Sequence, residues 1–131
     1  MQRAALAVLE PARADQETRA VQKVFAQKQR LTINRLTEIG VEFPGNPEGT
    51  FYAFGSVAKL PPPLNTGIGF MRAAFRSRVL TVPGEYFDVN PHKKRRGESP
   101  LEGFVRFSFG PSRENLEAGL TRLAEMVKAA R

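Results

Sequence analysis

The sequence Gly-Phe-Val-Arg-Phe-Ser-Phe-Gly-Pro at residues 103–111 decides how the rest of the chain can be arranged. Read as a strand, it sends alternate side chains to opposite faces of a sheet. One face is apolar and suited to packing under helices: Val105, Phe107 and Phe109. The other face carries Phe104, Arg106 and Ser108. A guanidinium among aromatic rings is costly to bury unless an anion meets it, and its planar fork matches a carboxylate or phosphate. We therefore expect Arg106 to contact a ligand.

The overall composition is that of one ordinary soluble domain. The 131 residues suffice for a single core, and 41% of them are hydrophobic and 25% charged, as in typical globular proteins. The chain has no cysteine, which excludes disulfides, thiolate catalysis and zinc–thiolate sites. No apolar run has the length of a membrane span, and the N-terminus lacks the apolar stretch of a signal peptide. We expect a cytoplasmic protein.

The net charge of +7 raises the question of nucleic-acid binding. The excess is spread over the chain except for a basic run at His92–Arg96, which follows Asn90-Pro91 and precedes Gly97 and is therefore predicted to be a loop. Short basic runs are unspecific signals, and no aromatic residue interleaves with this one to stack on bases. We interpret the run as a solvated surface loop in preference to a nucleic-acid patch. His92, beside four cations, is interpreted as a solvated residue rather than a catalytic base.

The N-terminal part of the chain is helical by its residue types. Residues 1–10 are rich in alanine and leucine, and Pro11 is predicted to stop a helix there. A longer helix is predicted from Asp15 to Ile39, with Gly40 just past its C-terminus. One broad face of this helix is apolar: Val21, Val24, Phe25, Leu31, Leu36 and Ile39.

The middle of the chain reads as extended segments, turns and a short helix. Val41–Phe43 and Thr50–Val57 are two extended pieces separated by residues typical of turns, which predicts a hairpin. The Leu-Pro-Pro-Pro-Leu sequence at residues 60–64 must be a surface connection. Apolar residues at helical spacing predict a helix from Thr66 to about Ser77.

The C-terminal part contains two further strands and a helix. Val79–Val82 reads as a strand, and Glu85–Leu101 as a loop that is long for a compact domain. After the Arg106 strand, Ser112 is a natural N-cap for a last amphipathic helix that buries Leu116, Leu120, Leu123 and Val127. The fold class that fits this order is α/β of the two-layer α+β kind, with a small, mostly antiparallel sheet packed against helices on one face. The face with Arg106 would then need a partner or a ligand.

Three segments in this order resemble a known family. They are Gly-Thr-Phe-Tyr-Ala-Phe at residues 49–54, Val-Leu-Thr-Val-Pro-Gly-Glu-Tyr-Phe at 79–87 and Phe-Val-Arg-Phe-Ser-Phe-Gly at 104–110. Together they resemble the C-terminal, small domain of class I/II pyridoxal-phosphate-dependent aminotransferases, which have the aspartate aminotransferase fold (fold type I). The resemblance covers nearly the whole chain. It implies that residues 1–39 match the end of the family's large domain and the long interdomain helix, and residues 40–131 its small domain.

The resemblance also implies roles for two residues. Arg106 matches the arginine that binds the α-carboxylate of the amino-acid or 2-oxo-acid substrate. Phe87 matches a position near the substrate, with a core aromatic as the alternative that stays open. The family's cofactor, pyridoxal phosphate, is attached to a lysine of the large domain, and no lysine of this chain has a similar sequence context: Lys23, Lys28, Lys59, Lys93, Lys94 and Lys128. We therefore expect the chain alone neither to bind the cofactor nor to transaminate.

Two functions of different classes follow from these observations. The first is the substrate-binding domain, or C-terminal fragment, of an aminotransferase, which would close over a cofactor supplied by a large domain. The second is a non-catalytic binding or self-association module, because the apolar surface that a large domain would cover favours a homo-oligomer. Nucleic-acid binding through Lys93–Arg96 is the weakest alternative.

Overall fold

The strand that contains Arg106, β3 (Phe104–Ser108), lies at the centre of a three-stranded antiparallel sheet with the order β1-β3-β2. The computed structural model describes residues 9–45, 48–90 and 94–131. β1 (Tyr52–Ser56) pairs with the full length of β3 and places Phe54 opposite Arg106. On the other side, β2 (Val82–Pro83) is a two-residue edge strand.

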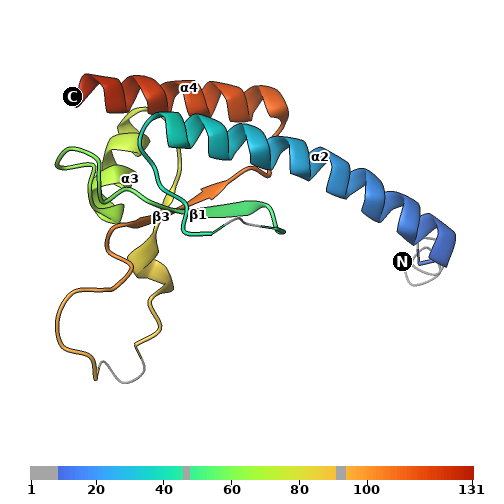
Figure 1. The fold of residues 1–131 in the computed structure, drawn as a ribbon, viewed down its shortest axis with the longest axis horizontal. Helices are drawn as coiled ribbons and strands as arrows, with labels where there is room; N and C mark the ends of the chain where they lie inside the picture. The colour runs from blue at the N-terminus through green and yellow to red at the C-terminus, as the bar shows by residue number, and fades with distance from the viewer. Residues whose placement is uncertain (1–8, 46–47, 91–93) are drawn as a thin grey trace.

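The predicted division of β3 between an apolar and a polar face is confirmed. Val105, Phe107 and Phe109 are buried in the core. Figure 1 shows α2 (Pro11–Glu38) and α4 (Arg113–Ala129) side by side over one side of the sheet, while the loop that follows β2 extends away on the other. The predicted fold class, with helices packed on one face of a small antiparallel sheet, is therefore confirmed.

The long N-terminal helix starts earlier than predicted. We expected Pro11 to end one helix and Asp15 to begin the next, but Pro11 is the first residue of α2. Proline is tolerated there because the first helical N–H groups have no intrahelical acceptor to lose. The carboxylate of Glu10 caps the helix and accepts hydrogen bonds from the backbone N–H groups of Ala12 at 3.3 Å and Arg13 at 3.1 Å. Most of the helix predicted for residues 1–10 falls outside the described residues.

Only the C-terminal half of α2 is packed into the core. Leu36 is fully buried and Leu31 is partly buried, as the apolar face predicts. Val21 and Val24, on the same predicted face, are 52% and 48% exposed, because this part of the helix extends beyond the sheet (Figure 1). The N-terminal half of α2 therefore presents an apolar stripe, Val21 and Val24, that the described residues cover only in part.

The predicted hairpin is reduced to a single bridge. Glu42 and Ser56 exchange backbone hydrogen bonds of 2.9 and 2.6 Å, so the two extended segments do run antiparallel. The pairing does not continue as a ladder along Val41–Phe43, and the turn between the segments includes residues 46 and 47, which lie outside the described part of the chain.

The strand predicted at Val79–Val82 is wrong for most of its length, since only Val82 joins the sheet. The helix before it, α3 (Gly67–Arg76), agrees with the prediction and is capped by the Thr66 hydroxyl, which accepts from the N–H of Gly69 at 3.1 Å. At the other end of α3 the N–H of Val79 donates to the Ala74 carbonyl at 2.8 Å. This bond ties Val79 to the end of the helix and turns it away from the sheet.

The last helix agrees with the sequence prediction. Ser112 caps α4, and its hydroxyl accepts from the N–H of Asn115 at 3.3 Å. The four predicted apolar positions are all buried: Leu116, Leu120, Leu123 and Val127. Within the described residues, no helix combines the length and the apolar character that crossing a membrane requires.

Candidate functional site

The guanidinium of Arg106 lies between two aromatic rings on the face of the sheet that the helices leave free. Its central carbon is 4.2 Å from the ring centroid of Tyr52 and 4.7 Å from that of Phe87. Tyr52 stands diagonally across the β1–β3 ladder, because Phe54 is the residue directly opposite Arg106. Such contacts stabilise a cation over the ring faces. They also limit the orientations open to the guanidinium.

Further aromatic rings support this pair. The ring of Phe54 is stacked on that of Phe104, with centroids 5.4 Å apart and planes 8° apart. Phe54 also meets the ring of Phe87 edge to face, at 6.1 Å and 83°. Offset-stacked and edge-to-face arrangements are the favourable geometries for aromatic pairs. Arg106 is thus surrounded by aromatic side chains from β1, β3 and the segment after β2.

Phe87 is brought to the site by a short 3-10 helix, η1 (Gly84–Phe87), that comes directly after β2. Its side chain is 39% exposed, so it is not the core aromatic that the sequence left open as an alternative. The next residue, Asp88, forms an ion pair with Arg95. The hydrogen bonds from Arg95 and, secondly, from Ser99 lower the pKa of Asp88 below its usual value. The loop is thereby tied back at the residue next to Phe87.

The same ion pair changes the interpretation of the basic run. Arg95 is engaged by Asp88, and its backbone N–H also donates to the side-chain oxygen of Asn90 at 3.1 Å. Lys94 and Arg96 are exposed, as expected of a solvated loop, whereas His92 and Lys93 lie outside the described residues. Arg95 therefore has a structural role that the sequence did not indicate.

A hollow of about 390 Å³ opens on the Tyr52 side of the guanidinium. We call it the Arg106 hollow; the residues that line it are Phe43, Pro44, Gly45, Thr50, Tyr52, Phe54 and Arg106. Arg106 contributes the only charged side chain among these lining residues. The volume of the hollow lies near the lower end of the range for small-molecule sites.

No acidic side chain of the described residues forms an ion pair with Arg106. The carboxylates that do form ion pairs are held by other cations: Glu38 by Arg35, Glu42 by Lys59, Asp88 by Arg95 and Glu117 by Arg113. The lining of the Arg106 hollow also offers no lysine. These residues fit an anion from outside the chain, but they do not provide the covalent anchor that pyridoxal phosphate requires.

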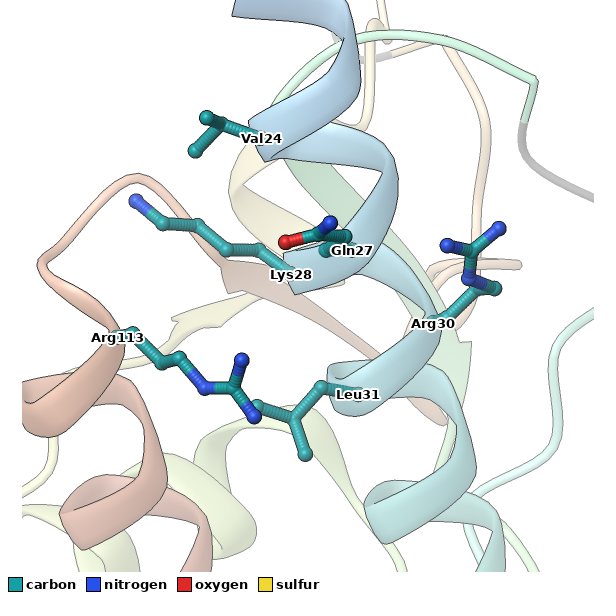
Figure 2. A pocket seen from close by; sticks show the side chains of 6 residues that line it. All are labelled: Val24, Gln27, Lys28, Arg30, Leu31 and Arg113. Atoms are coloured by element: carbon teal, nitrogen blue, oxygen red, sulfur yellow. The ribbon is translucent and has the colours of Figure 1, made fainter.

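A second hollow, of about 280 Å³, lies between α2 and the start of α4 and contains more cations (Figure 2). The ammonium group of Lys28 donates to the Pro111 carbonyl at 2.6 Å, and Arg113 pairs with Glu117 at 2.8 Å. In Figure 2 the guanidinium of Arg30 points away from both of them. Lys28 and Arg113 are held by partners of their own, and Arg30 points away from them. We therefore place the candidate site at Arg106.

Sequence reasoning predicted Arg106 and Phe87 as site residues, and the structure brings them into contact. It did not single out Tyr52 and Phe54, which also lie beside Arg106. The available signal was strand alternation in residues 50–57, which sends Tyr52 and Phe54 to one face. Turning that signal into a contact with Arg106 requires the register between β1 and β3, which alternation alone does not give.

Comparison with known proteins gives one consistent result. The chain is 27% identical to an aromatic aminotransferase from Pyrococcus horikoshii, with a TM-score of 0.75, over 96% of this chain and 30% of that one. It is 25% identical to a Methanococcus jannaschii protein with an active site similar to those of kynurenine aminotransferases (TM-score 0.71, 95% of this chain and 29% of that one). It is also 25% identical to an aspartate aminotransferase from Thermus thermophilus (TM-score 0.62, 95% and 26%). No protein-family model and no curated protein matches the chain.

The fold is therefore that of an aminotransferase-like α+β domain. The resemblance seen in the sequence is confirmed by these structures, and the chain spans about 30% of the length of the first of them. A match of this extent is consistent with the small, C-terminal part of an aminotransferase rather than with a whole enzyme.

Proposed function

We propose that the chain is the substrate-binding domain of a pyridoxal-phosphate-dependent aminotransferase, in which Arg106 binds the carboxylate of an amino acid or 2-oxo acid. The observation that carries this proposal is the guanidinium of Arg106, held between Tyr52 and Phe87 with no acidic partner among the described residues. The match to part of the length of several aminotransferases supports it.

The geometry of Arg106 suits a carboxylate. The rings of Tyr52 and Phe87 contact the guanidinium, whose N–H donors all lie in its own plane. A carboxylate is planar and accepts two parallel N–H bonds from such an edge. Because its orientation is already restricted, the side chain loses less entropy when the ligand binds than a free arginine would.

The cofactor and most of the catalytic chemistry belong, in this proposal, to a companion large domain. In the full-length family, pyridoxal phosphate supplies the group that accepts electrons during transamination. The residues around Arg106 would bind and orient the substrate carboxylate while the companion domain supplies the lysine. We assign residues 1–39 to the end of the large domain and the interdomain helix, residues 40–131 to the small domain, and the assembly to the cytoplasm.

The test of the carboxylate role is a titration of the ¹⁵N-labelled chain with pyruvate, monitored by NMR. We expect saturable shifts at the Arg106 side chain and at the Tyr52 backbone amide. Arg106→Gln should weaken pyruvate binding by about tenfold or more, since it removes a charge-assisted bidentate contact. Arg113→Gln is the matched control, because Arg113 is exposed, pairs with Glu117 and lines a different hollow. The dissociation constant of pyruvate for Arg113→Gln should stay within about twofold of that for the unmodified chain.

The alternative function is a non-catalytic module that self-associates. It is favoured by the exposed apolar stripe on α2, where Val21 and Val24 are both about half exposed and Val21 borders a hollow of about 420 Å³ together with Phe51. Such a surface suits either a companion domain or a second copy of the chain. The pyruvate titration separates the two functions, because a self-association module has no use for a free guanidinium. Shifts that are unchanged by Arg106→Gln would count against the carboxylate role.

A further inference from the structure

We propose that a groove between α4 and the end of β3 is a second binding site, and that its ligand is an amphipathic anion, a carboxylate on an unbranched alkyl chain. The groove is a hollow of about 490 Å³, here called the α4 hollow, and its lining includes residues 78–81, residues 107–108 and one side of α4 between Asn115 and Leu123. Its volume is within the range of small-molecule sites. The site does not involve Arg106 and goes beyond the proposed function.

The α4 hollow lies where the sheet opens between β2 and the end of β3. The last residue pair of the two strands in this direction is Val82 with Arg106. The same antiparallel register would next bring Leu80 opposite Ser108, but β2 begins only at Val82. The chain before β2 is held elsewhere, because the N–H of Val79 donates to the end of α3. The opening therefore follows from the path of the chain between α3 and β2.

The walls of the α4 hollow are mostly apolar. Phe107 lines it from the sheet, and Leu116, Leu120 and Leu123 line it from α4. Leu80 lines it as well and is 82% exposed, although it is a large apolar residue. An alkyl chain that lies along the hollow would cover part of Leu80, and both would lose contact with water. The hollow thus suits the apolar part of an amphipathic ligand.

The charged residues that line the α4 hollow are two arginines, Arg78 and Arg122. Both also line a neighbouring hollow of about 440 Å³, so they stand where the two hollows meet. Arg122 donates to the Arg78 carbonyl at 3.4 Å, and neither arginine forms an ion pair with a carboxylate of the described residues, Glu125 of the neighbouring hollow included. Two such cations at one end of an apolar groove complement an anionic head group on an apolar chain.

The experiment titrates the ¹⁵N-labelled chain with octanoate, butyrate or 1-octanol and follows the backbone amides of Leu80 and Leu120 by NMR. Octanoate offers both the chain and the charge, butyrate has a shorter chain, and 1-octanol has no charge. We expect octanoate to bind about tenfold more tightly than butyrate, because the longer chain covers more apolar surface. It should bind about fivefold more tightly than 1-octanol, which cannot pair with a guanidinium.

Gly119 allows the charge requirement to be tested with variants of equal size. It lies within α4 and lines the α4 hollow, and a Cβ atom there would meet nothing within 4 Å. Gly119→Glu adds a carboxylate three residues before Arg122, a spacing at which side chains on a helix are neighbours. This carboxylate would pair with Arg122 and repel the probe. Octanoate should therefore bind Gly119→Glu about fivefold more weakly than Gly119→Gln, its uncharged control.

Arginine variants locate the head group. Arg78→Gln should weaken octanoate binding about threefold or more and leave 1-octanol within about twofold. Arg72→Gln is the control, because Arg72 is exposed on α3 and does not line the α4 hollow. Arg106→Gln should leave the octanoate shifts at Leu80 unchanged. The NMR spectra themselves report whether each variant is folded.

The outcomes separate this site from the proposed function. Weaker octanoate binding in Gly119→Glu than in Gly119→Gln, with shifts at Leu80 that do not depend on Arg106, would support the second site. Equal binding of octanoate and butyrate, or equal binding by the two Gly119 variants, would overturn it and leave the pyruvate test of Arg106 unaffected. Shifts at Leu80 that follow the protein concentration instead of octanoate would assign the groove to a second copy of the chain and would also overturn it.

Discussion

Replacement of Phe109 by alanine should lower the free energy of unfolding by about 4 kcal/mol, the cost typical of removing a fully buried aromatic ring. Phe109 has no exposed surface, and its ring lies 6.3 Å from that of Phe25 on α2. It comes just after β3 on the apolar side of the sheet, so its removal leaves a cavity where the helices meet the strands. The backbone hydrogen bond from Phe109 to the Phe51 carbonyl, at 3.0 Å, does not depend on the side chain. The loss is therefore one of packing.

Urea unfolding monitored by circular dichroism measures this effect. Phe75→Ala is the control, because Phe75 is also a phenylalanine but is 66% exposed on α3. Its replacement should change the free energy of unfolding by less than about 1 kcal/mol. Phe109→Leu, which keeps much of the apolar volume, should fall between the two variants. Equal effects of Phe109→Ala and Phe75→Ala would contradict the burial of Phe109.

Replacement of Gly69 by alanine should destabilise the protein by about 3 kcal/mol, although alanine is the better helix former. A Cβ atom at this position of α3 would lie 1.9 Å from the carbonyl oxygen of Pro63 and 2.8 Å from the Thr66 hydroxyl oxygen. The first of these is backbone and cannot rotate away. The start of α3 and the proline-rich connection before it would have to separate, and the helix cap of Thr66 would be disturbed.

A second helical glycine provides a matched control. Gly119 lies within α4, and a Cβ atom there would meet nothing within 4 Å. Gly119→Ala should therefore raise the free energy of unfolding by about 1 kcal/mol through the helix preference of alanine. The same substitution thus has opposite signs at the two positions. Stabilisation by Gly69→Ala in urea unfolding would show that α3 does not approach the Pro63 carbonyl this closely.

Patterns within a single segment of the sequence predicted the parts of the fold that depend on residues near one another in the chain. The alternation at residues 103–111 correctly separated Val105 from Arg106, and the apolar spacing after Ser112 correctly gave the buried face of α4. The prediction was wrong where two local rules compete. Pro11 can end a helix or begin one, and the capping carboxylate of Glu10 before it favoured a beginning.

Features that depend on distant parts of the chain were not predictable in the same way. Val79 has the composition of a strand, but its N–H is used by the Ala74 carbonyl at the end of α3. The exposure of Val21 results from the length of α2 relative to the sheet (Figure 1), which no periodicity reveals. The site shows the same division: the strand pattern and the resemblance indicated Arg106, whereas its contact with Tyr52 depends on the register of β1 against β3.

The proposed division of labour between this chain and a companion large domain is tested most directly by cofactor binding to the chain alone. The purified chain is mixed with pyridoxal phosphate, its absorbance spectrum is recorded, and borohydride is added before peptide mapping by mass spectrometry. We expect the spectrum of the free cofactor and only scattered, substoichiometric labelling of lysines, because none of the described residues that line the Arg106 hollow is a lysine. Stoichiometric attachment of the cofactor to a single lysine would contradict the account, since it would place a complete cofactor site within these 131 residues.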